Sequence, residues 1–119
     1  MSDAVTIYHN PRCSKSRETL SLLKTHGVEP QVVLYLVETP PDAATLRGLV
    51  QMLNLSSARD LMRQKEELYR SLNLADSGLS EEALIQAMVE NPKLIERPVV
   101  VKQGQARIGR PPEQVLEIL

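Results

Sequence analysis

Residues 5–18 read VTIYHNPRCSKSRE, and they predict the first strand, turn and helix of the fold. The run from Val5 to Tyr8 is β-branched and aromatic, which is typical of a strand, and His9-Asn10-Pro11 ends it in a tight turn. From Ser14 the pattern is helical, and Gly27 is placed to end that helix.

The segment after this helix completes a strand–helix–strand unit. Residues 31–36, QVVLYL, form an apolar run, and a right-handed crossover makes such a strand parallel to the first one. Helical periodicity then covers an insert at about residues 42–92. Start signals stand at Pro41-Asp42 and Ser80, and we expect a break between two short helices near residues 63–65.

The C-terminal part changes its period and predicts a β-hairpin. Residues 99–101 and 105–108 are its strands, and Pro111-Pro112 starts a closing helix with Val115, Leu116 and Leu119 facing inward. The order βαβ, helical insert, ββα is that of an α/β thioredoxin-like fold of the glutaredoxin type. We expect one domain over residues 1–119, with a cis peptide bond before Pro98, where the third strand opens.

Composition excludes several classes of function. The 119-residue chain has 42% hydrophobic residues, no Phe or Trp and only three Tyr, too few rings for a base-stacking platform. Fourteen basic and fifteen acidic residues give a net charge of −1, so we expect neither nucleic acid nor a membrane surface as partner. The N-terminus resembles no secretory signal and no apolar run is long enough to span a membrane, so a cytoplasmic protein is expected.

Cys13 is the only cysteine, which excludes an intramolecular disulfide scaffold. It stands where the turn meets the helix, so backbone N–H groups of the first helical turn would point at its sulfur. Arg12, Lys15 and Arg17 add positive charge nearby, and together these features would lower the pKa of the thiol. The alternative is a small apolar filler, and the local residues alone leave both readings open.

Other candidate residues are judged by their positions. One Cys and two His offer no ligand spacing for a metal ion, so no metal site is expected. His9 is either an acid–base partner of the thiol or a loop imidazole bonded to backbone, and Ser16 either a hydroxyl donor or a structural residue. Three arginines stand at special places: Arg97 precedes Pro98, Arg110 ends the hairpin and Arg63 lies near the helical break. A guanidinium binds tetrahedral oxyanions in bidentate fashion.

The chain resembles the glutaredoxin-coupled arsenate reductases, in a match that runs from Thr6 to Leu119 and is carried by five stretches in order. They are IYHNPRCSKSRETL, LYLVETPP, ARDLMRQKEELY, LIERPVVV and RIGRPPEQVLEIL. The chain ends at Leu119, where the best-known arsenic-resistance members extend further, so the resemblance is to the short, chromosomal-type branch. Those members also carry smaller, uncharged residues where Ser14 and Lys15 stand here.

The resemblance implies an oxidoreductase that reduces arsenate to arsenite in arsenic detoxification, through a covalent intermediate on Cys13. It places oxyanion binding on Arg63, Arg97 and Arg110, and assistance to the thiolate on His9 and Ser16. A single thiol predicts an outside electron donor, here glutathione as co-substrate and glutaredoxin as partner, with no tightly bound cofactor.

Two other functions are possible on the same fold. A Spx-like transcriptional regulator uses a redox-sensing cysteine pair, and Ser16 stands where the second cysteine of that pair would be. A thiol-disulfide oxidoreductase acting on glutathione mixed disulfides needs a glutathione groove rather than a set of arginines.

Overall fold

The computed structural model describes residues 4–36 and 41–119, so residues 37–40 of the LYLVETPP stretch lie outside the described part. The chain divides into two compact units. The first consists of residues 1–39 and 97–119, and the second of residues 40–96, which contains the predicted insert.

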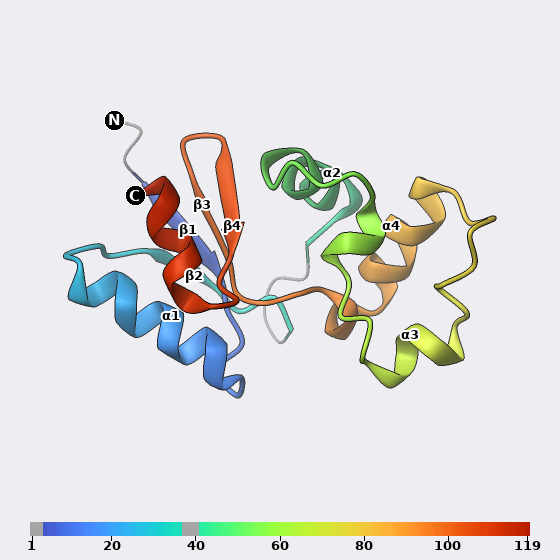
Figure 1. The fold of residues 1–119 in the computed structure, drawn as a ribbon, viewed down its shortest axis with the longest axis horizontal. Coiled ribbons are helices and arrows are strands. Elements are labelled where there is room, and N and C mark those ends of the chain that lie inside the picture. The colour runs from blue at the N-terminus through green and yellow to red at the C-terminus, as the bar shows by residue number, and fades with distance from the viewer. Residues whose placement is uncertain (1–3, 37–40) are drawn as a thin grey trace. The chain divides into compact units, whose positions relative to one another are not determined.

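The first unit is a four-stranded sheet with two helical segments (Figure 1). Its sheet order is β2-β1-β3-β4, with β1 parallel to β2 and antiparallel to β3, and β3 antiparallel to β4. This arrangement confirms the predicted α/β thioredoxin-like fold. The elements are β1 (Val5–Tyr8), α1 (Ser14–Thr25), β2 (Gln31–Val33), β3 (Val99–Lys102), β4 (Gln105–Ile108) and the 3₁₀ helix η3 (Pro112–Ile118).

The core of this unit joins the sheet to both helical segments. Val5 and Ile7 are two residues apart and therefore lie on the same face of β1. Val100 of β3 lies beside them because it pairs with Ile7. Leu23 from α1 and Val115 from η3 are fully buried against them. The N-terminus of α1 is thereby held at the end of β1. Residues 9–13, the cysteine turn, connect the two elements.

Two elements differ from the prediction. Strand β2 ends at Val33 instead of Leu36, because its pairing with β1 runs only from Thr6 to Tyr8 and the neighbouring chain then enters the cysteine turn. The closing helix is a 3₁₀ helix, whose period of three residues buries Pro112, Val115 and Ile118 rather than Leu116.

Two glycines end local elements as predicted. Gly27 has a φ of +77°, and a Schellman motif closes α1 with bonds from Gly27 N–H to Lys24 O (3.0 Å) and Val28 N–H to Leu23 O (2.9 Å). The hairpin turns at Gln103 and Gly104, with φ of +51° and +79°, the signs required by a type I′ turn.

The peptide bonds before Pro98 and Pro111 are cis.

The second unit is helical, and α4 contacts α2, η1 and η2 in its interior. Its elements are α2 (Ala43–Met52), η1 (Ala58–Leu61), α3 (Glu67–Ser71), α4 (Glu81–Glu90) and η2 (Pro92–Leu94). The break between η1 and α3 confirms the expected interruption near residues 63–65. Side chains cap three of these elements, since Asp42 accepts from Thr45 N–H, Ser57 from Arg59 N–H and Ser80 from Ala83 N–H.

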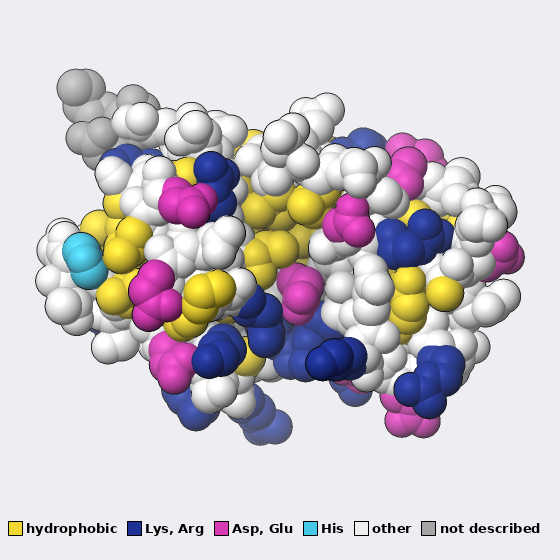
Figure 2. Space-filling view, viewed as in Figure 1, with side chains coloured by type: hydrophobic (Ala, Val, Ile, Leu, Met, Phe, Trp, Pro, Cys, Tyr) yellow, Lys and Arg dark blue, Asp and Glu magenta, His cyan; other side chains and the backbone are white. Residues whose placement is uncertain are grey.

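The surface agrees with the balanced composition. Acidic and basic side chains both appear on the face shown in Figure 2, and the chain has a net charge of −1. Within the part of the chain that the structure describes, each helix is too short or too polar to cross a membrane.

Candidate active site

Cys13 occupies the N-cap position of α1, in the first unit. Its backbone is extended, with φ −96° and ψ 124°, and its N–H donates to Asn10 O at 3.0 Å. Arg17 N–H donates to Cys13 O at 3.0 Å and closes the first turn of the helix. The thiol therefore lies at the positive end of the helix dipole, as the sequence predicted.

The turn before Cys13 is held by bonds on both sides. Asn10 Oδ1 accepts from Arg12 N–H at 3.0 Å, which is the Asx-type turn expected before Pro11. The Arg17 guanidinium donates to Pro11 O at 3.0 Å from the helix side. These bonds fasten the cysteine turn to the first turn of α1.

His9 and Ser16 form a buried pair beneath this turn. Ser16 Oγ accepts from Asn10 N–H at 3.0 Å and lies 2.7 Å from His9 Nδ1. Burial lowers the pKa of His9, and the charges of Arg17 and Lys24 lower it further. A lowered pKa favours the neutral imidazole, and the Nδ1–Oγ hydrogen bond ties that ring to Ser16. The Ser16 side chain thus bonds to His9 and to the backbone of the turn, while the Ser16 backbone N–H donates a hydrogen bond to the Cys13 sulfur.

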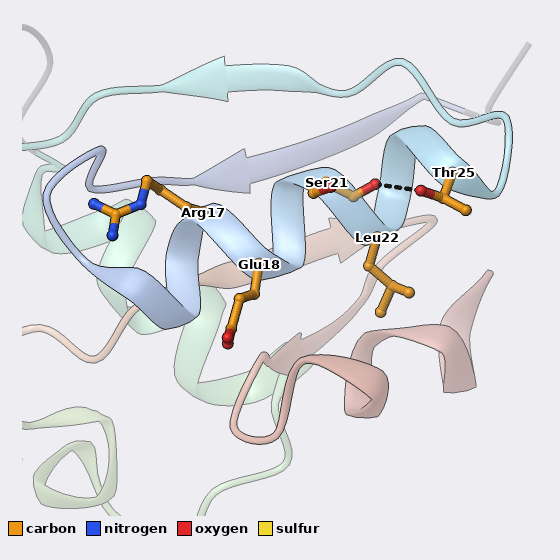
Figure 3. A pocket seen from close by; sticks show the side chains of 5 residues that line it. All are labelled: Arg17, Glu18, Ser21, Leu22 and Thr25. Atoms are coloured by element: carbon orange, nitrogen blue, oxygen red, sulfur yellow. Dashed lines mark hydrogen bonds between the residues drawn. The ribbon is translucent and has the colours of Figure 1, made fainter.

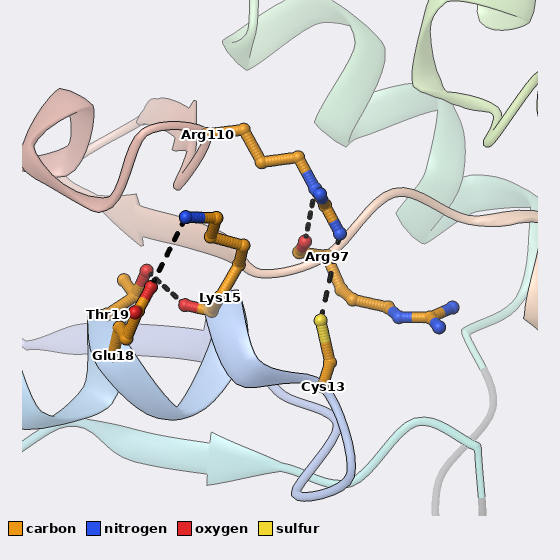
Figure 4. A network of polar contacts seen from close by, with 6 residues as sticks. All are labelled: Cys13, Lys15, Glu18, Thr19, Arg97 and Arg110. Atoms are coloured by element: carbon orange, nitrogen blue, oxygen red, sulfur yellow. Dashed lines mark hydrogen bonds and ion pairs between the residues drawn. The ribbon is translucent and has the colours of Figure 1, made fainter.

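Two of the predicted arginines lie beside the thiol. Arg110 Nη2 is 3.7 Å from Cys13 Sγ, and Arg110 Nε donates to Arg97 O at 3.0 Å (Figure 4). The second bond fixes the direction of the Arg110 side chain. Segments more than 80 residues apart in the sequence therefore bring Cys13, Arg97 and Arg110 together within one unit.

The surroundings of Cys13 lower the pKa of its thiol overall. Partial burial raises that pKa, but hydrogen bonds from Ser16 N–H, the Arg97 side chain and Lys15 N–H, together with the Arg110 charge, outweigh this effect. The helix N-terminus contributes to the lowered pKa as expected, whereas the cations that contribute are Arg97 and Arg110 instead of Arg12, Lys15 and Arg17. This favours a reactive thiolate over an apolar filler.

Gly109 and Thr19 are parts of the site that the sequence reasoning missed. A Cβ on Gly109 would lie 2.5 Å from Thr19 Oγ1 and 2.8 Å from Pro98 Cγ, so only glycine fits between them. Gly109 N–H also donates to Pro98 O at 2.9 Å. This close approach sets the position of Arg110, the next residue.

A helical pattern could have revealed the buried face of α1. Ser16, Thr19 and Leu23 are its fully buried residues, at the i, i+3 and i+7 spacing of one helix face. The polar character of the first two conceals that spacing from a reading based on apolar residues alone.

Arg63 belongs to the second unit. Its Nη1 donates to Glu66 Oε2 at 3.0 Å, and Lys93 Nζ lies 3.6 Å from the other oxygen of that carboxylate. Its part in oxyanion binding stays a prediction. Across residues 4–36 and 41–119, no three His, Cys, Asp or Glu side chains gather so that they could hold a metal ion.

The fold and this geometry define a thioredoxin-like protein whose single cysteine faces two arginines. The sequence matches the ArsC family over residues 8–118, and the chain belongs to that family.

Individual relatives cover nearly the whole chain. Uncharacterized protein YfgD of Escherichia coli K12 is 76% identical over 119 residues, covering 100% of this chain and 99% of the relative. An arsenate reductase of Haemophilus influenzae is 49% identical over 116 residues, covering 98% of this chain and 99% of the relative. The solved structure of an arsenate reductase from Vibrio cholerae is 62% identical, with a TM-score of 0.96 and 100% coverage of both chains.

Proposed function

We propose that this protein is an arsenate reductase that converts arsenate to arsenite with electrons from glutathione and glutaredoxin. The observation that carries the proposal is Cys13 Sγ, with a lowered pKa and 3.7 Å from the Arg110 guanidinium. Arsenate reductases among the relatives, 44–49% identical over at least 97% of this chain, support the choice of substrate.

The first step forms a bond between sulfur and arsenic. The Cys13 thiolate attacks arsenic(V), and the displaced hydroxide takes one proton from solvent and leaves as water. Arg97 and Arg110 neutralise the remaining oxyanion charge, and Arg63 is proposed as the third cation. The lowered pKa of Cys13, to which Arg97 and Arg110 contribute, favours the thiolate, which is the form that attacks.

The next steps transfer two electrons. The thiol of glutathione displaces a second oxygen as water and gives a Cys13–S–As–S–glutathione adduct. A glutaredoxin thiolate then attacks the glutathione sulfur, and the electron pair of the broken As–S bond reduces arsenic(V) to arsenic(III). Water cleaves the remaining Cys13–As bond, which releases arsenite and restores the thiolate.

The electron donor must come from outside this chain. The 119 residues contain one cysteine, so a second thiol cannot resolve the adduct within the molecule. We propose that the protein acts in the cytoplasm, where glutathione is abundant. The steps above require no tightly bound cofactor.

A coupled assay tests the proposal. Arsenate-dependent oxidation of NADPH is measured with glutathione, glutaredoxin and glutathione reductase, with Cys13→Ser as control. We expect turnover that requires both arsenate and Cys13. Folded protein without arsenate-dependent turnover contradicts the proposal, and turnover on glutathione mixed disulfides alone would replace it with a thiol-disulfide oxidoreductase.

A further inference from the structure

A cavity of about 380 Å³ lies between α1 and the segment that begins η3. Its lining combines two carboxylates, an ammonium group and apolar surface, from residues Lys15, Glu18, Leu22, Pro111, Pro112 and Glu113. None of these side chains has a role in the steps above. The notable member is Lys15, which stands beside the cysteine turn.

Both walls of this cavity are close in sequence to the groups that surround the reacting sulfur. Lys15 lies two residues after Cys13 on α1, and Pro111 directly follows Arg110, whose guanidinium contacts Cys13 Sγ. A neighbouring cavity shares Glu18 and Leu22 (Figure 3). In that view Glu18 and Leu22 project from α1 toward the C-terminal helix, whereas Arg17 turns toward the cysteine turn.

A third cavity of the first unit lies elsewhere. Its lining includes His26 and Val28, after the C-terminal end of α1, and Lys102 at the end of β3. Of these three cavities, the one at Lys15 has walls that are closest in sequence to both Cys13 and Arg110.

The charges in the cavity match an α-amino-acid headgroup. Lys15 Nζ lies 3.5 Å from Glu18 Oε2, and both side chains are about half exposed, at 47% and 56%. Exposed pairs of this kind are weak, so a ligand can replace each partner. An amino-acid headgroup carries a carboxylate and an ammonium on one carbon atom, and Lys15 and Glu18, with Glu113 nearby, present the opposite charges.

We propose that this cavity binds the γ-glutamyl headgroup of glutathione, with Lys15 holding its α-carboxylate and Glu18 and Glu113 its ammonium group. This inference rests on the proposed function, in which glutathione attacks at Cys13. The proposal requires that the cysteine of the tripeptide, which two extended residues place at most roughly 7 Å from the headgroup, reaches arsenic on Cys13. Leu22 and the two prolines contact its methylene groups.

Binding is tested without any reaction. The ¹⁵N-labelled Cys13→Ser protein is titrated with S-methylglutathione, whose sulfur cannot react, and amide shifts are followed by NMR. We expect saturating shifts at Lys15, Glu18, Leu22 and Glu113. In the same background Lys15→Met should raise the Kd about fivefold, the upper range for an exposed ion pair. N-acetylation of the γ-glutamyl ammonium should weaken binding to both proteins.

A matched variant controls for the loss of one positive charge. Lys102→Met removes a lysine that lines the separate cavity near His26, and it should leave the Kd unchanged. Saturating shifts that lie outside this cavity, equal effects of Lys15→Met and Lys102→Met, or the absence of saturable binding at the glutathione concentrations of the coupled assay would overturn the proposal.

The two proposals fail in different ways. In the coupled assay with Cys13 present, Lys15→Met should raise the KM for glutathione and leave the KM for arsenate unchanged. Binding at Lys15 without arsenate turnover would support this site and reject the arsenate substrate. Turnover with a glutathione KM that does not respond to Lys15 would reject this site alone.

Discussion

Helix α1 of the first unit and three helical segments of the second unit, α2, η1 and α4, begin in opposite ways. Asp42, Ser57 and Ser80 each place a side-chain oxygen on a backbone N–H group of the helix that follows. Among the described residues, α1 receives no such bond, because its N-cap is Cys13, and its first turn contains no acidic residue. Glu81 and Glu82 supply that acidic charge in α4.

The difference separates a structural helix start from a reactive one. At α1 the N–H groups of Lys15 and Ser16 lower the pKa of the Cys13 thiol instead of bonding to a cap. A side-chain cap stabilises a helix by about 1 kcal/mol, so α1 lacks stabilisation that α2 and α4 have. These N–H groups, which no side chain caps, point at the sulfur and form the kind of helix N-terminus that binds an oxyanion.

The largest effect is expected when α1 is given an ordinary cap. Cys13→Asp should abolish arsenate-dependent turnover because the nucleophile is lost. It should also stabilise the fold by about 1 kcal/mol relative to Cys13→Ala, because aspartate is a preferred N-cap. Coupled-assay rates and thermal unfolding measure the two effects. Equal stability of the two variants would show that the N–H groups of α1 are not open to a cap.

Removal of Arg110 should have the next largest effect. Arg110→Ala should lower kcat/KM for arsenate about 10- to 100-fold, the range for a lost hydrogen bond to a charged group. Because the Arg110 charge lowers the pKa of Cys13, its removal should raise that pKa and shift the pH profile of Cys13 alkylation to higher pH.

The control for this variant lies on the same hairpin. Arg107 pairs with Glu117 at 2.8 Å, and Arg107→Ala should leave the alkylation profile unchanged. Identical profiles for Arg110→Ala and the unaltered protein would remove Arg110 from the thiolate site.

A smaller effect is expected at Gly109. Gly109→Ala forces a methyl group against Thr19 and Pro98, and it should destabilise the protein by about 1–3 kcal/mol and weaken arsenate binding by displacing Arg110. Urea unfolding and the KM for arsenate measure both consequences.

Gly48→Ala is the matched change in the second unit. In the described part of the chain, apart from its chain neighbours and the backbone of α2 itself, no atom lies within 4 Å of a Cβ at Gly48. This variant should be about 0.5–1 kcal/mol more stable than the unaltered protein. If both alanine variants behave alike, packing at Gly109 does not position the site.

The smallest effect is expected at a cap of the second unit. Ser80→Ala removes the oxygen that accepts from Ala83 N–H and should destabilise the protein by about 1 kcal/mol. The pH profile of Cys13 alkylation should not change. An altered profile would mean that the start of α4 is not purely structural.

Local signals allowed most of the fold to be predicted. Strand β1, the glycine end of α1, the Ser80 cap and the hairpin all depend on residues close together in the sequence. The length of β2 could not be predicted from its own residues, because it depends on how many residues of β1 pair with it. The 3₁₀ form of η3 depends on packing against the sheet and α1.

The site was predictable in a more limited way. The position of Cys13 at a helix N-terminus is local, but its reactivity remained open because Arg97 and Arg110 come from the other end of the chain. The resemblance to a family supplied those arginines before the structure did. Gly109 was missed because its constraint comes from Thr19, a residue of another element.

The separation of 97 residues between Cys13 and Arg110 has a consequence during synthesis. A ribosome makes the cysteine turn early and the hairpin that carries Arg110 last. Until the C-terminal segment has been added and paired with β1, the sulfur lacks the Arg97 and Arg110 contributions that lower its pKa. The nascent chain therefore lacks both cations of the site, and the full set of groups around Cys13 assembles only when the chain is folded to its final strand.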